Sequence, residues 1–319
     1  PRHPLSYLMT LAHVGNRSLK PGEPEIAGLP SLTNNNWNLE ILEGPEGPTV
    51  EFRFDLGPNE LKPLGLNGSL QLVKRFRLSR IPTDESRQAA HRSYHLDYEV
   101  ELRNLGAAPL QIAYQLDGPT GLPLEGWWYT YKTHPTKFGG AGVRDVVCKA
   151  FGGKHRMFSN PNIVEREEEN AEYPMLSMFE DDEQPRLQYA GVDAQYFHSA
   201  LIANVPIDEA PANGTAADAD TDPDTDEYVF EEAFARTVAP IDTLRASRTD
   251  VSFRLVSPVI EIPAGGQHRQ QFLIFAGPKK PQVLALYGLK ECVTYGWFPL
   301  VAKPLQWVLH AFYRVVRNY

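Results

Sequence analysis

Cysteine is scarce in this chain, which has two such residues, Cys148 and Cys292, among 319. They lie far apart and form no Cys-x-x-Cys pair, which excludes a disulfide framework and a zinc ribbon. A single bridge between them stays possible but is not favoured. Long apolar runs are also lacking: no stretch of 18 apolar residues occurs, so no segment is expected to cross a bilayer.

An excess of positive charge is missing as well. Lys and Arg number 31 against 40 Asp and Glu, a net charge of −9. This balance excludes a general DNA or RNA binder, because such a protein needs a basic face for phosphates. The chain starts at Pro1 without Met or a signal peptide and ends at Tyr319 inside a helical pattern. We therefore expect a soluble piece of a longer protein.

Alternating apolar and polar residues predict antiparallel strands over much of the chain. Hydrophobic residues make up 42%, enough for a real core. The alternation is clearest over residues 93–103, and a helix could not produce it. Further strands are expected from Val50 and in the segments 70–78, 143–150, 195–205, 251–262 and 268–275. The fold class that follows is mainly β, an antiparallel β-sandwich with helices at the C-terminal end.

Two details of this architecture are also predicted. After a turn at residues 104–106, the alternation resumes over 110–116, so this strand is expected to form a hairpin with 93–103. Residues 1–48 contain scattered Pro, Gly and Asn, and we expect a loosely packed segment with one or two strands.

Two helical patterns follow the last predicted strand. Residues 282–294 have moderately helical spacing. From Pro304 the spacing is plainly helical, and the apolar face holds Leu305, Val308, Leu309, Phe312, Val315, Val316 and Tyr319. Two interpretations remain open. The helix packs on the sandwich core, or it lies in a membrane interface with Trp307 and Phe312 under the headgroups and Arg314 and Arg317 snorkelling outward.

One segment resembles a known family. Residues 295–309, Tyr-Gly-Trp-Phe-Pro-Leu-Val-Ala-Lys-Pro-Leu-Gln-Trp-Val-Leu, are similar to the stretch just before the second transmembrane helix of YidC-type membrane protein insertases. The strands at 73–78, 98–104 and 275–279, and the Gln-Tyr-Phe at 195–197, resemble strands of that family's periplasmic domain. The resemblance extends from about residue 30 onward and is weak between 118 and 190.

The resemblance implies a fold, a function and a location. The fold would be a β-supersandwich similar to galactose-mutarotase-like domains, with residues 1–277 as the sandwich and 278–319 as a helical tail. The whole protein would have an N-terminal transmembrane helix before this domain and five after it. It would assist the insertion and folding of bacterial inner-membrane proteins, alone or with the Sec translocon. This domain would be non-catalytic, lie on the periplasmic side and need no cofactor.

Partners and contact residues follow from the same resemblance. The expected partners are the bilayer surface, Sec translocon components including SecDF, and nascent membrane proteins. Tyr295, Gly296 and Trp297 would belong to a semi-rigid joint to the membrane part. The interfacial helix would use Pro304, Leu305, Trp307, Leu309, Phe312, Arg314 and Arg317.

An acidic insertion at residues 207–227 departs from the family pattern and is expected to be a mobile surface loop. Asp220, Asp222, Asp224 and Glu231 have EF-hand spacing, but Thr225 stands where the turn needs Gly and Pro223 lies within the loop. No metal site is therefore predicted.

An alternative function is a carbohydrate-binding or mutarotase-like supersandwich protein. Trp127, Trp128 and Tyr129 form an aromatic cluster that would line a groove for a sugar or peptide, although packing in the core or at an edge is the favoured explanation. His95, Glu99 and Glu101 share one face of a strand, as a general acid and base would require. They lie on its polar side, where we expect them to be solvated, so no catalytic residue is assigned.

Overall fold

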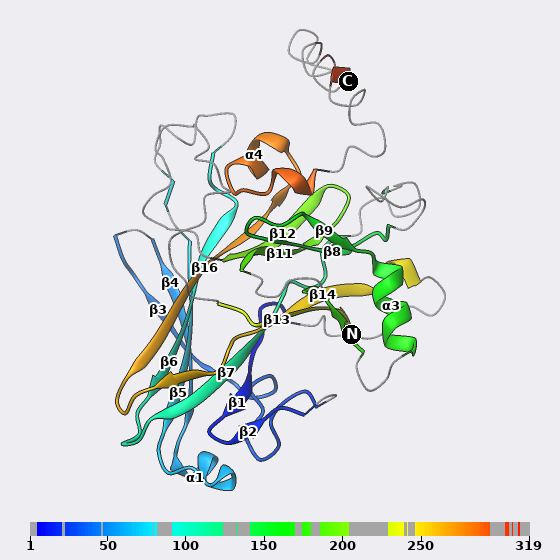
Figure 1. Ribbon diagram of the computed structural model, residues 1–319. Coiled ribbons are helices and arrows are strands. Elements are labelled where there is room, and N and C mark those ends of the chain that lie inside the picture. The colour runs from blue at the N-terminus through cyan, green and yellow to red at the C-terminus, as the bar shows by residue number, and fades with distance from the viewer. Residues whose placement is uncertain are drawn as a thin grey trace.

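The computed structural model describes residues 5–20, 23–45, 47–78, 80–81, 91–123, 132, 141–169, 174–179, 186–203, 229–238, 241, 246–293, 304–305, 308 and 312. Two antiparallel sheets face each other across a common apolar core (Figure 1). The prediction of an antiparallel β-sandwich is confirmed. Among the described residues, no helix is long and apolar enough to cross a membrane.

The larger sheet has nine strands in the order β3-β4-β5-β6-β16-β12-β11-β8-β9. In chain order the strands are β3 (Asn38–Leu42), β4 (Thr49–Leu56), β5 (Leu70–Arg77), β6 (His95–Asn104), β8 (Asp145–Ala150), β9 (Arg156–Phe158), β11 (Leu187–Asp193), β12 (Phe197–Ala203) and β16 (Gln267–Pro278). Those strands that the alternating sequence predicts, β4, β5 and β6 above all, lie side by side.

The smaller sheet has seven strands in the order β10-β13-β14-β7-β1-β2, with β15 also paired to β7. Its strands are β1 (Met9–Val14), β2 (Arg17–Ser18), β7 (Leu110–Asp117), β10 (Leu176–Ser177), β13 (Glu232–Val238), β14 (Asp250–Val256) and β15 (Ile260–Ile262).

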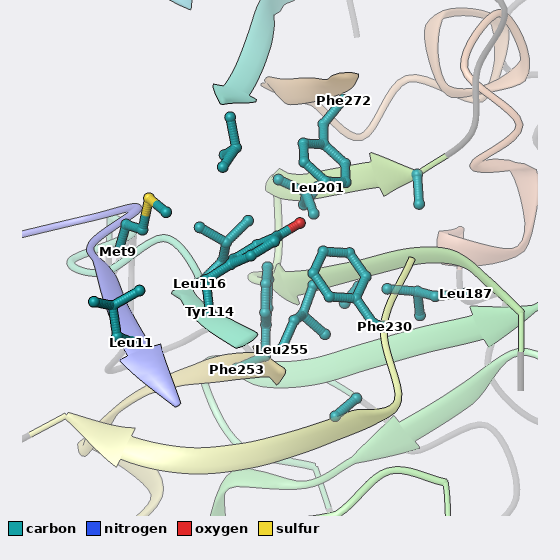
Figure 2. Close-up of a cluster of buried hydrophobic side chains, with 14 of the residues drawn as sticks. Met9, Leu11, Tyr114, Leu116, Leu187, Leu201, Phe230, Phe253, Leu255 and Phe272 are labelled. Carbon is teal, nitrogen blue, oxygen red and sulfur yellow. The ribbon is translucent and has the colours of Figure 1, made fainter. Parts of the chain in front are cut away.

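Aromatic side chains from both sheets meet in the core between them (Figure 2). The Phe230 ring stacks on Phe272 of β16 at 5.5 Å and meets Tyr114 of β7 edge-on at 6.3 Å. Gly118, which follows β7, is needed here, because a Cβ at that position would lie 2.6 Å from the Phe253 ring. Such interlocked packing joins the two sheets into one body.

The helices are short and lie around the sheets. They are α1 (Pro58–Leu61), η1 (Lys62–Leu64), α3 (Asn160–Glu169), η2 (Ala246–Arg248), α4 (Pro281–Ala285) and η3 (Lys290–Cys292). The helical pattern over 282–294 thus predicted a longer helix than exists. The left-handed Gly288, with φ of 70°, separates α4 from η3 because few other residues adopt that conformation without strain.

The predicted hairpin of strands 93–103 and 110–116 is wrong. β6 belongs to the nine-stranded sheet, whereas β7 belongs to the other and pairs with β1. Asn104 stabilises the crossing: its Nδ2 donates to the carbonyls of Ala108 at 2.8 Å and Ile262 at 3.0 Å. Its Oδ1 accepts a hydrogen bond from the Gly106 N–H at 3.0 Å. The Asn104 side chain thus provides hydrogen-bond partners for backbone groups of the connection, which passes between the sheets and does not form a hairpin turn.

The prediction for residues 1–48 is also wrong. Three strands lie there, and β1 is paired on both sides, by β2 and β7. Met9, Leu11 and Val14 are buried in the shared core. The prolines and glycines of this segment lie outside β1, so its composition as a whole concealed a core strand.

Candidate functional site

The segment from α4 to η3 packs against the outer face of the nine-stranded sheet, near β11 and β12 (Figure 1). Lys280 precedes α4, and Pro281 occupies its first turn, where its missing N–H costs nothing. A second apolar cluster, separate from the main core, forms beneath this segment. It comprises Val147, Tyr189, Ala200, Ile202, Leu273, Phe275, Val283, Leu284, Tyr287, Leu289 and Cys292. The sheet is therefore covered on both faces here.

Tyr287 holds the middle of this segment. Its ring packs 4.8 Å from that of Phe275, and its hydroxyl accepts a hydrogen bond from the Tyr94 N–H at 3.0 Å. The same hydroxyl lies 3.0 Å from Nδ1 of His95. Burial raises the pKa of Tyr287 to about 12, so the group stays neutral and can serve both partners.

A buried ion cluster centred on Asp193 lies on the same face. Its carboxylate contacts Nζ of Lys132 and Nζ of Lys279, each at 2.8 Å, and Nδ1 of His198 at 3.2 Å. Lys132 also reaches Asp145 at 2.8 Å. Burial alone would raise the pKa of Asp193, but the two lysines hold it well below the usual range. The cluster therefore keeps its charges paired away from water.

His198 links this cluster to the helical segment. Its Nε2 lies 3.6 Å from Sγ of Cys292 in η3. Burial opposes the charged ring, but Cys292 and Asp193 raise the pKa of His198 to about 9. Gly191 leaves space for the ring, since a Cβ there would lie 2.9 Å from Cε1 of His198.

Three side chains are arranged like a nucleophile, a base and an acid that orients the base: Cys292, His198 and Asp193. All three are buried, each only 1% exposed, so no substrate reaches the thiol in this arrangement. Their evident role is to hold η3 on the sheet. Neither cysteine forms a disulfide. Over the described part of the chain, no three His, Cys, Asp or Glu side chains are placed to hold a metal ion.

The structure describes four residues of the C-terminal helical pattern. All four are helical and exposed: Pro304, Leu305, Val308 and Phe312. The exposed fractions of the three apolar residues are 56% for Leu305, 37% for Val308 and 64% for Phe312. Their spacing of three and four residues places them on one side of a helix. Tyr295, Gly296, Trp297, Trp307, Leu309, Arg314 and Arg317 lie outside the described residues, so the interfacial helix stays a prediction.

Two other predicted features fall outside the described residues. They are the aromatic cluster Trp127, Trp128 and Tyr129, and the acidic insertion 207–227 with Asp220, Asp222 and Asp224. Glu231, the last residue of the EF-hand spacing, is exposed.

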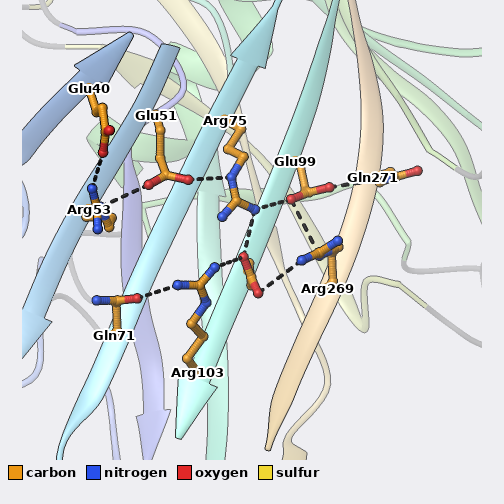
Figure 3. Close-up of polar contacts among 10 residues, drawn as sticks. Glu40, Glu51, Arg53, Gln71, Arg75, Glu99, Arg103, Arg269 and Gln271 are labelled. Carbon is orange, nitrogen blue, oxygen red and sulfur yellow. Dashed lines mark hydrogen bonds and ion pairs between the residues drawn. The ribbon is translucent and has the colours of Figure 1, made fainter. Parts of the chain in front are cut away.

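The expectation that His95, Glu99 and Glu101 are simply solvated is wrong. Glu101 is fully buried and accepts hydrogen bonds from Arg75 at 2.7 Å, Arg103 at 2.8 Å and Arg269 at 3.2 Å. Glu99 pairs with Arg75 in the same network (Figure 3). Four strands, β4, β5, β6 and β16, bring these charges together. The ion-pair lattice, as we call it, consists of Glu51, Arg53, Arg75, Glu99, Glu101, Arg103 and Arg269.

Most of this chain matches one known protein family. The family described as the YidC periplasmic domain matches residues 86–308, well over half of the chain. This chain belongs to the YidC periplasmic domain family. The match spans the ion-pair lattice strands from β6 onward, the Asp193 cluster and the helical segment, so these features lie within the YidC domain itself.

Curated relatives carry the name membrane protein insertase YidC. The relative from Citrifermentans bemidjiense is 29% identical over 98 residues, which are 30% of this chain and 18% of that protein. The relative from Pseudomonas putida is 31% identical over 81 residues, 25% of this chain and 14% of that protein. The matched segments thus represent a small part of each insertase.

The chain also matches solved structures at low sequence identity. A galactose mutarotase-like protein from Lactobacillus casei is 9% identical, with 85% of this chain and 84% of that chain covered and a TM-score of 0.42. Another from Clostridium acetobutylicum is 8% identical, with 77% and 68% covered and a TM-score of 0.40. At these scores the likeness is too distant to support any inference about activity.

Proposed function

We propose that this chain is the non-catalytic extracytoplasmic domain of a membrane protein insertase, on the periplasmic side of the bacterial inner membrane. The whole protein would assist the insertion and folding of inner-membrane proteins, alone or with the Sec translocon. Membership of the YidC periplasmic domain family supports this proposal, as does the name of the curated relatives. Sec components including SecDF, nascent membrane proteins and the bilayer surface are the proposed partners.

The domain would act by positioning. The β-sandwich, residues 1–277, carries the α4–η3 segment on its outer face through Tyr287, His198 and the second apolar cluster. Because this segment is held on the sheet, the residues after η3 would begin at a fixed position on the sandwich. The joint at 295–299 and the amphipathic helix would then set the orientation of the sandwich over the membrane.

The observation that carries the proposal is the exposure of Leu305, Val308 and Phe312. Full burial of a side chain of this size contributes about 1.5–3 kcal/mol, and a part of that is available at each of these positions. A lipid interface would accept such a row of apolar groups. In the proposed helix, Trp307 and Leu309 would add to the anchor, and Arg314 and Arg317 would reach the headgroups.

Vesicle binding tests this proposal. We expect the double variant Leu305→Asp/Phe312→Asp to bind phosphatidylglycerol-containing vesicles at least about tenfold more weakly than the wild-type chain, a difference of about 1.4 kcal/mol. Sedimentation with vesicles measures the partition coefficient.

The matched control is Leu105→Asp/Val259→Asp, which changes two comparably exposed apolar residues on the sandwich. This control should bind as the wild type does. Equal loss in both double variants, or no loss in either, would contradict an anchoring role for the C-terminal helix.

A further inference from the structure

The strands with a single partner among the described residues differ in length. Four of them are very short: β2 and β10 have two residues each, and β9 and β15 have three each. The fifth, β3, has five residues and ends the nine-stranded sheet (Figure 1). Short edge strands are a common protection against unwanted pairing, because they offer few free backbone groups. β3 lacks this protection.

Proline, lysine and a bulge, which protect other edge strands, are also absent from β3. Its sequence, Asn-Leu-Glu-Ile-Leu, contains no Pro or Lys, and its register with β4 runs from Asn38 to Leu42 without a bulge. All five residues are exposed. Within the described residues β3 pairs with β4 alone, so one row of its backbone N–H and C=O groups faces outward.

The two faces of β3 have different chemistry. Leu39 and Ile41, exposed by 59% and 61%, stand opposite Phe52 and Val50 of β4 and extend the apolar inner face of the sheet. Glu40 stands on the outer face, opposite Glu51, and pairs with the exposed Arg53. The edge therefore presents Leu39 and Ile41 on one face, and the Glu40 carboxylate between Asn38 and Leu42 on the other.

We propose that β3 is a strand-addition site for an extended segment of a partner polypeptide. The segment would pair antiparallel with β3 and alternate apolar residues, beside Leu39 and Ile41, with a basic residue opposite Glu40. Backbone hydrogen bonds supply affinity in this binding mode, and alternate side chains supply selectivity. Opposite charges across a strand pair are favourable, and like charges are not.

A second copy of this chain fits the edge less well. Antiparallel pairing of β3 with itself over all five residues would place the two Glu40 carboxylates directly opposite each other. This like-charge contact selects against self-pairing. The site is also independent of lipid binding by the C-terminal helix, so either proposal can fail while the other holds.

Peptide binding tests the site. The probe is a labelled synthetic peptide with the core Thr-Ile-Lys-Ile-Thr, and the matched peptide has Glu in place of Lys. Fluorescence anisotropy on the 319-residue chain should show at least about fivefold tighter binding of the Lys peptide. A third peptide, with both isoleucines replaced by proline, should not bind, because it lacks two N–H donors and disfavours a strand.

Variants of the chain locate the interaction. Ile41→Lys should weaken the Lys peptide at least about tenfold, whereas Val259→Lys, at another exposed aliphatic position, should leave it unchanged. Glu40→Lys should reverse the preference toward the Glu peptide. Melting temperatures close to the wild type would show that each variant is folded.

Three results would overturn the proposal: equal binding of the Lys and Glu peptides, full binding by Ile41→Lys, or dimerisation of the chain that Ile41→Lys abolishes. The third would assign the edge to a second copy. Leu305→Asp/Phe312→Asp should bind the peptide normally, which separates this site from the membrane-anchoring proposal.

Discussion

The outer face of the nine-stranded sheet has two halves, which are covered by different kinds of side chain. Across β4, β5, β6 and the start of β16, charged side chains form the ion-pair lattice (Figure 3). Across β8, β11, β12 and the end of β16, the α4–η3 segment covers the face and an apolar cluster fills the space. One continuous surface is thus polar where it stays open and mainly apolar where a helix covers it.

β16 shows the change within a single strand. Arg269 belongs to the ion-pair lattice, and Leu273 and Phe275, on the same face, lie in the apolar cluster. In the open half, Glu101 is buried, but the three arginines that pair with it remain partly exposed to water. In the covered half the charged side chains themselves are buried, so the charges that remain, such as Asp193, need a full set of partners. Burial, more than residue type, decides how much each ion pair stabilises.

The largest expected effect is therefore in the covered half. Asp193→Ala leaves Lys132 and Lys279 buried without their shared partner, and we expect a loss of about 3–5 kcal/mol in the free energy of unfolding. Urea unfolding followed by circular dichroism measures it. A loss below about 1 kcal/mol would mean that water reaches the cluster and that the two halves do not differ in this way.

An intermediate effect is expected for Glu101 in the open half. Glu101→Gln removes the charge that three arginines share, and a loss of about 1–3 kcal/mol follows. Burial alone would raise the pKa of Glu101, but Arg103, Arg75 and Arg269 lower it from 4.5 to about 2.

This lowered pKa gives the effect a pH dependence. The stabilisation by ionised Glu101 is fully present above pH 4.5 and is lost as the pH falls toward 2. The wild type and Glu101→Gln should therefore differ most near neutral pH and converge in acid. A difference that stays constant between pH 7 and 2.5 would show that lost packing, and not lost charge, is responsible.

The smallest effect is expected at the exposed rim of the lattice. Glu40 pairs with Arg53, and both side chains are well exposed. Glu40→Ala should change the free energy of unfolding by no more than about 1 kcal/mol, and added salt should reduce even that. A larger loss would indicate that the lattice acts as one cooperative network out to its edge.

The same comparison explains which strands the sequence reveals. β4, β5 and β6 alternate because one face meets the core and the other meets water or the ion-pair lattice, and all three were predicted. β11 is buried at every residue from Leu187 to Asp193, so it has no alternation to detect. β1 was not predicted, because residues that favour turns lie on both sides of it in the sequence. The charged α3 has no clear apolar stripe, and it too was not predicted.

The candidate site divides in a similar way. The apolar side of the C-terminal pattern, with Leu305, Val308 and Phe312, is visible from spacing alone, whereas its exposure is known only from the structure. The docking contacts of η3 are not visible from spacing, because His198 and Cys292 are separated by 94 positions along the chain. Gly191, which makes room for the His198 ring, carries no signal of that role until the strands are paired.

Periodicity along the chain was enough to specify a β-rich body followed by an amphipathic end, since both patterns depend only on near neighbours. The pairing of β7 with β1, the covering of half a sheet by α4 and η3, and the buried charges around Asp193 were set by contacts between distant segments. Local sequence patterns cannot encode these contacts. Burial on both faces of a strand removes the alternation, and a buried charge is stable only where its partners from distant segments meet in space.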